Sequence, residues 1–475
     1  MNISSIKKNL FYNFLYQILV VALPLITTPY ISRILGANKI GLYSYAYSIA
    51  YYFVIFIMLG LNNYGNRTIA AVKNDKQKLS QSFFSIYYMQ LITGIVMIVI
   101  YIIYGILSDS HLMYWIMLLY VISGAVDINW FFFGLEQFQL TVVRNTIIKI
   151  ITTVCIFVFV KSSSDIYLYG ILMTLGILLS QLLLWPFVRR YVDFCKVSFK
   201  DVASHIRPNL VLFIPVIAVS LYKIMDKIML GNMSSMTEVG LYESSEKVIQ
   251  IPLALVASLG TVMLPRITNM IANNKDIKNY FSYSISFAMF LSTSICFGIM
   301  AVADLFVPIF YGSGYEKCII LFQILLPSCI FLAFSDVLRT QYLIPLKKDK
   351  IFIQSVSLGA IVNIIINLFL IPQFQSVGAA IGTLMAEIAV CLYQAVRVRK
   401  EVDINKYFVQ SLPFVVSGIL MYLVLIFIPN KNYNIIFLLL AKIFIGFFVY
   451  ILSLLLQMKV FNKHIEIVDF MNRGG

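Results

Sequence analysis

The sequence predicts an all-α polytopic membrane protein with about 14 transmembrane helices. Of its 475 residues, 60% are hydrophobic and only 12% are charged. A water-soluble chain of this size would need far more charge on its surface. Fourteen apolar stretches, most of them close to the roughly 20 residues that cross a bilayer as a helix, alternate with short polar loops. A repeated motif then divides the chain into two related halves.

The spans follow one another with the polar loops as their boundaries. The first half is predicted to cross the membrane at Phe11–Leu35, Leu42–Leu61, Phe83–Leu107, Met113–Phe133, Ile147–Val160 and Tyr167–Val188. The second half is predicted to cross it at Leu210–Leu230, Leu241–Leu264, Tyr283–Val307, Ile319–Ile344, Ile351–Ile371 and Val377–Val396. Two further spans, Phe408–Ile428 and Ile435–Leu456, complete the set. The polar start of the chain leads into the first span without a small-residue cleavage site, so we expect an uncleaved helix.

The internal repeat is carried by Gly-Leu-Tyr followed by an arginine. Gly41-Leu42-Tyr43 returns as Gly240-Leu241-Tyr242, and Arg67 and Arg266 each lie 26 positions after the motif's glycine. Further equivalences pair Leu35-Gly36 with Leu230-Gly231 as span ends, Asp127 with Asp336, Gly176 with Gly382, and Gln181 with Glu387. Because each half holds six spans, the halves are parallel repeats that we expect to enclose a central cleft.

The domain organisation follows from this repeat. We predict an N-terminal six-helix lobe over 1–190, a cytoplasmic interlobe loop over 191–207, a C-terminal six-helix lobe over 208–400, and two additional helices with a cytoplasmic tail over 401–475. Pro24, Pro29 and Pro215 lie inside spans. They either assist bending between two access states or are simply tolerated, as prolines in membrane helices often are.

The basic residues indicate the orientation in the membrane. By the predicted spans, 25 lysines and arginines fall in the loops and tails on the side of the N-terminus, and four fall on the opposite side. The positive-inside rule therefore places both termini in the cytoplasm, with an even number of spans. The same distribution explains the net charge of +15 without nucleic acid as a partner.

Several function classes have no support in the sequence. The six cysteines are scattered and show no metal-ligand spacing, and the three histidines lie in different loops or tails. No GxxxxGK phosphate-binding loop occurs either. We therefore expect no enzymatic activity, no metal site and no cofactor.

Basic side chains at membrane depth are the candidate substrate contacts. A charge in hydrocarbon costs several kcal/mol, so such residues usually face a cavity or a partner. The five candidates are Arg33, Lys223, Lys227, Lys247 and Arg339. Four of them also have a structural alternative: Arg33 and Lys227 as interface anchors, Lys247 paired with Glu243, and Arg339 paired with Asp336. For Lys223, which lies deeper in its span, a cavity is favoured. Lys149 and Lys442 also fall within spans.

Acidic side chains at membrane depth are the candidate sites for ion coupling. They are Asp127, Asp226, Asp336 and Glu387. Glu387 is the principal candidate because no basic residue lies within one helical turn of it, so its carboxyl group could bind H⁺ or Na⁺. The alternative is a protonated, hydrogen-bonded acid with a structural role.

The pattern of motifs resembles the Wzx-type polysaccharide-transport flippases of the multidrug/oligosaccharidyl-lipid/polysaccharide exporter superfamily. The resemblance covers nearly the whole chain. It rests on Asn9–Tyr16, the prolines of the first helix, Ser32–Gly36 with Gly41–Tyr43, Trp130–Glu136, and Asp226–Gly231 with Gly240–Tyr242. The aromatic run Trp130–Phe133 is typical of an interfacial belt, although stacking on sugar rings is the alternative.

The resemblance implies movement of undecaprenyl-diphosphate-linked oligosaccharide units from the cytoplasmic to the outer leaflet, for capsule, exopolysaccharide or O-antigen biosynthesis. It implies a polysaccharide polymerase and glycosyltransferases as pathway partners, beside membrane lipid. Two alternatives stay open on the same scaffold: a lipid II flippase and a cation-coupled multidrug exporter. The excess of basic over acidic groups at membrane depth favours an anionic headgroup over a cationic drug.

Overall fold

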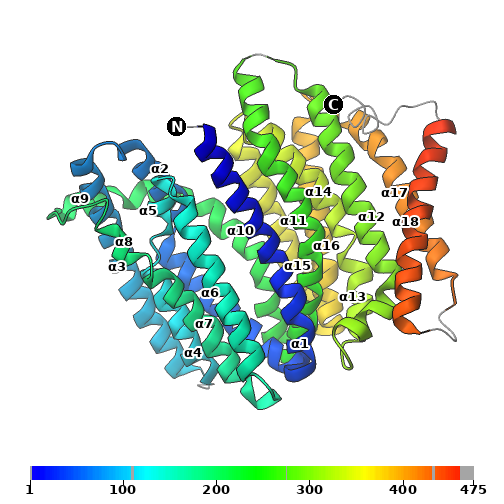
Figure 1. Cartoon of the computed structure of the whole chain (residues 1–475), viewed down its shortest axis with the longest axis horizontal. Helices are drawn as coiled ribbons and strands as arrows, with labels where there is room; N and C mark the ends of the chain where they lie inside the picture. Colours follow the sequence, from blue (N-terminus) through cyan, green and yellow to red (C-terminus); the bar gives the residue numbers. More distant parts are fainter. Residues whose placement is uncertain (1–2, 109–111, 274, 430–433, 461–475) are drawn as a thin grey trace. The chain divides into compact units, whose positions relative to one another are not determined.

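The computed structural model describes residues 3–108, 112–273, 275–429 and 434–460, and these contain helices and connections but no strand (Figure 1). His111 and His464 lie outside the described residues. Contacts divide the chain into two compact units. Unit 1 comprises Met1–Gly231 with Ser235–Gly240, and unit 2 comprises Asn232–Ser234 with Leu241–Gly475.

Unit 1 holds the first ten helices. They are α1 (Ile3–Met58), α2 (Leu61–Val72), α3 (Lys76–Leu107), α4 (Leu112–Ala125), α5 (Asn129–Gly134), α6 (Phe138–Phe159), α7 (Ile166–Leu182), α8 (Trp185–Val188), α9 (Phe199–Ser204) and α10 (Ile206–Met233), with the 3₁₀ turn η1 (Ser163–Asp165) before α7. The helix α10 packs with this unit, although the repeat predicts it as the first helix of the second lobe. The two six-helix lobes, 1–190 and 208–400, therefore stay a prediction that is based on the sequence repeat.

Unit 2 holds the remaining helices. They are α11 (Met236–Ala272, from Leu241 onward in this unit), α12 (Lys278–Phe310), α13 (Lys317–Leu325), α14 (Ser328–Leu338), α15 (Asp349–Phe374), α16 (Ser376–Val398), α17 (Ile404–Ile426) and α18 (Ile435–Val460). A turn of π-helix, η2 (Arg339–Leu343), follows α14. The predicted tenth span is therefore built from α13, α14 and η2 in series.

Twelve helices among the described residues are long and apolar enough to cross a membrane. The first of these, Leu23–Val72, contains the second predicted span and part of the first. The helix α11, which corresponds to the predicted eighth span, is not among the twelve. The multi-pass helical architecture is thus confirmed, while the count of fourteen spans stays a prediction.

The first two predicted spans are continuous in the structure except at Gly36. Gly36 is the non-helical residue inside α1, with φ of 73° and ψ of 168°. That left-handed backbone conformation carries no steric cost for glycine, which is why the helix can be interrupted at one residue and resume at once. The equivalent Gly231 behaves differently, because α10 continues to Met233 and Gly231 packs against the ring of Tyr45. The end of α10 nevertheless falls within two residues of the predicted end of the seventh span at Leu230-Gly231.

The two copies of the repeat motif meet within unit 1. A Cβ atom on Gly41 would lie 1.7 Å from the carbonyl oxygen of Met236, and one on Gly240 would lie 1.9 Å from that of Ala37. Asn38 also donates a hydrogen bond to the hydroxyl of Thr237 over 3.2 Å. The duplicated glycines therefore let two helix backbones cross in direct contact.

The core of unit 1 contains most of the aromatic run Trp130–Phe133, which is part of the family resemblance. Trp130, Phe131 and Phe132 are fully buried in a cluster with Phe83 and Leu184. The indole nitrogen of Trp130 donates to Gln90 over 3.0 Å. These three side chains are core residues, so the expectation of an interfacial belt and its sugar-stacking alternative are both wrong for them.

Candidate functional site

The predicted cations of unit 1 differ in exposure. Arg33 is exposed on α1 and donates to the carbonyl oxygen of Pro29 over 3.4 Å. Lys227 is buried on α10, beside the buried Asp226. Lys223, one turn earlier on α10, is exposed and makes no hydrogen bond or ion pair with any described residue. It lies ten residues before the end of α10, a depth of about 15 Å.

The predicted cations of unit 2 are held in local ion pairs. Lys247 lies 3.3 Å from the carboxylate of Glu243, four residues earlier on α11. Arg339 pairs with Asp336 and also lies over the ring of Phe352, 5.6 Å from its centroid. Both pairs match the spacing that the sequence predicts. Arg339 begins the π-helical turn η2, an irregularity often found at functional sites.

Asp127 occupies a buried polar network where α4 gives way to α5. Its carboxylate accepts hydrogen bonds from the backbone and side chain of Asn129, over 2.8 and 2.7 Å, and from Gln181 over 3.3 Å. Asp127 and Gln181 are the predicted repeat equivalents of Asp336 and Glu387. In unit 1 the two positions therefore meet through a hydrogen bond.

Arg144 completes this network and is a residue that sequence reasoning missed. By the predicted spans it belongs to the cytoplasmic loop before Ile147, but it lies in α6 and is only 8% exposed. Its guanidinium donates to Asn129 over 3.0 Å and to Asn145 over 2.7 Å, and it lies near Gln181. The signal in the sequence was weak because Arg144 precedes the fully apolar part of the span. The result is a partly buried polar cluster in which Arg144 is more buried than Asn129 and Gln181.

Glu387 lies in the interior of unit 2. It is only 3% exposed, on a face of α16 that also carries the buried Cys391 one turn later. The neighbouring α15 contributes buried asparagines, and a Cβ on Gly382 would lie 2.1 Å from the side-chain oxygen of Asn367. The predicted coupling acid is thus enclosed by tightly packed helices, among polar and apolar groups.

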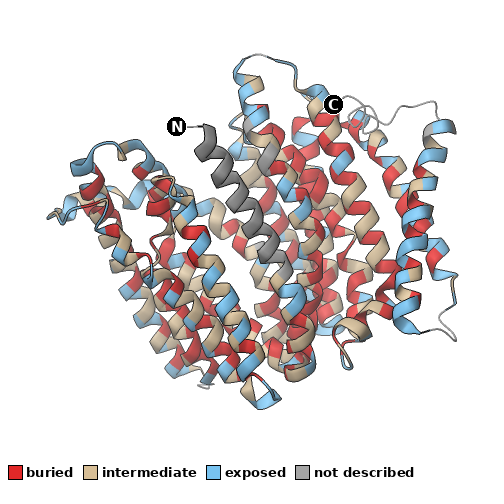
Figure 2. Cartoon of the chain, in the orientation of Figure 1, coloured by how far each residue is buried: buried red, intermediate tan, exposed pale blue. Residues whose placement is uncertain are grey.

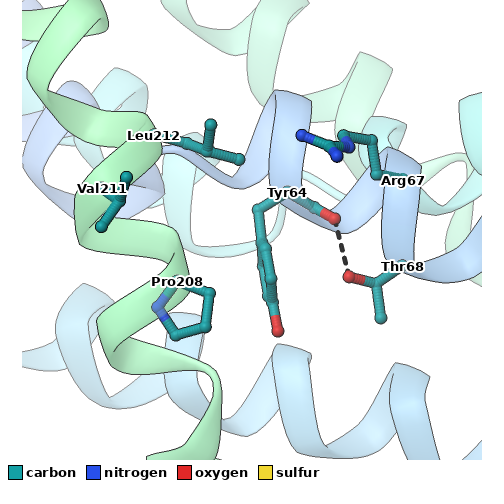
Figure 3. Close-up of a pocket in the computed structure, with 6 residues that line it drawn as sticks. All are labelled: Tyr64, Arg67, Thr68, Pro208, Val211 and Leu212. Carbon is teal, nitrogen blue, oxygen red and sulfur yellow. Dashed lines mark hydrogen bonds between the residues drawn. The ribbon is translucent and has the colours of Figure 1, made fainter.

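A pocket of about 480 Å³ lies in unit 1 between α2 and α10, and Figure 3 shows its lining. Tyr64, Arg67 and Thr68 come from α2, opposite Pro208, Val211 and Leu212 of α10. The hydroxyl of Tyr64 also lies 2.6 Å from Nδ1 of His205, whose Nε2 lies 2.8 Å from the hydroxyl of Ser85. The arginine of the repeat motif therefore lines a pocket that the sequence did not predict.

The comparisons with known proteins agree with this architecture. The family model described as "Polysaccharide biosynthesis protein" matches residues 6–271. The "Putative O-antigen transporter" of Escherichia coli (strain K12) is 21% identical over 81% of this chain and 94% of its own length. The protein of the same name from Shigella dysenteriae is 25% identical over 82% of this chain and 98% of its own length.

Two solved structures share the fold. "Lipid II flippase MurJ, inward closed conformation" has a TM-score of 0.71 and 15% identity, covering 96% of this chain and 99% of its own. An inward-facing "multidrug resistance MATE family transporter of the MOP superfamily" has a TM-score of 0.62 and 13% identity, covering 81% and 95%. At these identities the likeness is one of fold.

Proposed function

The chain belongs to the polysaccharide biosynthesis protein family, as a Wzx-type flippase of the MOP superfamily and not an enzyme, and we propose that it moves undecaprenyl-diphosphate-linked oligosaccharide units across the membrane. Movement would run from the cytoplasmic to the outer leaflet of the bacterial cytoplasmic membrane, with both termini in the cytoplasm. The product would enter capsule, exopolysaccharide or O-antigen biosynthesis, beside glycosyltransferases and a polymerase.

The observation that carries the proposal is the exposed position of Lys223 on α10, in a chain that belongs to this family. An exposed ammonium group about 15 Å from the end of an apolar helix is costly if it faces hydrocarbon, so its exposure favours contact with water or an anion. A diphosphate is a suitable partner because lysine acts as a mobile point charge on phosphate. The two relatives named as O-antigen transporters point to the same class of substrate.

The mechanism that follows is transfer by positioning, without bond chemistry. The protein would provide a hydrated, basic surface for the diphosphate and sugars, while the polyprenyl chain stays in lipid. Two parallel lobes that alternate access to the two leaflets would complete the cycle. Arg33 and Lys227 would add positive charge to that path, and Lys247 and Arg339 would contact the substrate from within their ion pairs with carboxylates.

Deletion of the gene tests the function directly. We expect lipid-linked oligosaccharide to accumulate in the cytoplasmic leaflet, and the wild-type gene to reverse this. Lys223→Gln should restore transport about tenfold to a hundredfold less efficiently, since one contact to a charged group contributes about 1.5–3 kcal/mol. Transport is measured as the fraction of lipid-linked oligosaccharide accessible from outside spheroplasts.

Lys200→Gln is the matched control, because Lys200 is exposed on α9 and its loss changes the charge equally. It should transport like the wild type. Absence of accumulation in the deletion strain contradicts the flippase proposal. Accumulation of lipid II instead would favour a lipid II flippase, and sensitivity to cationic drugs without any lipid accumulation would favour a multidrug exporter.

Glu387 is the residue that we propose couples transport to an H⁺ or Na⁺ gradient. Glu387→Gln keeps the shape and hydrogen-bonding capacity but removes the titratable group. We expect transport in vesicles to lose its response to an imposed ion gradient. Glu316→Gln, at an exposed position between α12 and α13, should leave that response unchanged. An unaltered gradient response in Glu387→Gln would assign Glu387 a structural role.

A further inference from the structure

A second, mainly apolar cavity lies in unit 2 on the side of α18. It has a volume of about 450 Å³ and is lined by α12, α17 and α18. Its walls include Phe290, Phe306, Met421, Leu425, Ile443 and Phe447. Within this unit α18 packs against α12 and α17, and many of its apolar side chains are exposed (Figures 1 and 2). We call this cavity the α18 groove.

One charged side chain lines the α18 groove, and it is almost completely buried. Lys442 is 2% exposed. It makes no hydrogen bond or ion pair with any residue that the structure describes. The hydroxyl groups that line the same groove are satisfied within the protein, since Ser294 donates to the carbonyl oxygen of Phe290 and Tyr450 bonds with Thr293, each over 2.7 Å. The ammonium group of Lys442 is therefore the polar group of the groove that a bound ligand would pair with.

The position of Lys442 argues against simple contact with water at the membrane surface. It lies seven residues after Ile435, the first residue of α18, at a depth of about 10 Å. A lysine at this depth can extend along its stem to the interface, but it would then be exposed. Burial of the charge among apolar side chains instead favours an anion inside the groove.

We propose that the α18 groove binds one anionic phospholipid, with its phosphate on Nζ of Lys442 and an acyl chain along the apolar wall. Charge complementarity selects the anion, and the apolar wall selects a chain. The surrounding residues Ile443 and Phe447 are 53% and 60% exposed, so the groove borders a surface suited to the bilayer, which supplies phospholipid continuously. By the predicted topology the lipid would come from the outer leaflet. None of the residues that line the groove is among those proposed above for the substrate path.

Native mass spectrometry of the purified full-length protein tests this site. The wild type should retain phosphatidylglycerol in preference to zwitterionic phosphatidylcholine of the same chain length. Lys442→Met, which keeps the length of the side chain but not the charge, should retain phosphatidylglycerol about tenfold less well, as expected for the loss of one charge-assisted hydrogen bond. Lys442→Arg should retain it.

Lys459→Met is the matched control, because Lys459 is an exposed lysine at the other end of the same helix. It should retain phosphatidylglycerol like the wild type. Equal loss in Lys442→Met and Lys459→Met overturns the site, as does a wild type without preference for phosphatidylglycerol, a comparison that needs no variant to fold. Displacement of phosphatidylglycerol by undecaprenyl phosphate at equal concentration would also overturn it, by making the groove a substrate site.

Discussion

Arg144→Met should lower the free energy of unfolding of unit 1 by about 3–5 kcal/mol, the usual effect of removing one partner from a buried charge cluster. Arg144 is 8% exposed and donates to Asn129 and Asn145. Without the guanidinium, the side-chain oxygen of Asn129 loses this donor and that of Asn145 keeps only Ser180, at 2.9 Å. The nearby carboxylate of Asp127 also loses the positive charge beside it. We expect a markedly lower Tm for the purified protein and a reduced yield of folded protein.

Two further variants distinguish the network from a general effect of charge. Arg190→Met removes an arginine that is exposed and lies over the ring of Phe187, so it should change stability by no more than about 0.5 kcal/mol. Arg144→Lys keeps the charge but loses the planar fork of donors, and an intermediate Tm is expected. A wild-type Tm for Arg144→Met would show that the network contributes little to folding.

The parts of the fold that the sequence predicts well are those set by local physics. Hydropathy alone locates most of the spans, because a membrane helix must be apolar along its whole length. The pairs Glu243 with Lys247 and Asp336 with Arg339 also follow from spacing, since residues three or four apart share a helix face. Such features need no knowledge of the neighbouring helices.

The polar interior could not be predicted in the same way. Asp127 and Gln181 are 54 positions apart, and their contact depends on how α4, α5 and α7 pack. The burial of Lys442 depends likewise on α12 and α17. Hydropathy also does not distinguish an aromatic residue of the core from one of the membrane interface, which is why Trp130 was assigned to the wrong environment.

The repeat contains one feature that the sequence predicts and one that only the structure shows. The sequence identifies Gly41 and Gly240 as equivalent positions of the repeat. Equivalent positions need not be in contact, because each glycine could pack only against helices of its own half. The structure adds that the two glycines touch, because each removes the Cβ atom that would meet the other backbone. A contact of this kind constrains both copies of the motif together. Substitution of either glycine should therefore have the same effect.

Gly240→Ala tests this crossing and should lower the free energy of unfolding by about 1–3 kcal/mol, the usual range for overpacking. The new Cβ would lie 1.9 Å from the carbonyl oxygen of Ala37, and a backbone atom cannot move aside as a flexible side chain can. The crossing should open, so a disulfide between cysteines placed at Asn38 and Thr237, which are joined by a hydrogen bond, should form less readily than in the protein with Gly240.

Gly298→Ala provides the control, with an effect expected in the opposite direction. Gly298 lies inside α12, and the nearest atom to its new Cβ would be 3.7 Å away, an ordinary van der Waals contact. Alanine is favoured over glycine in a helix by up to about 1 kcal/mol, so this variant should be as stable as the wild type or more so. If Gly240→Ala matched Gly298→Ala in both Tm and disulfide formation, the two backbones would not cross in direct contact. If Gly240→Ala alone lowered the Tm and slowed disulfide formation, the role of the duplicated glycine would be to let the two helices approach closely. It would not be to form a turn.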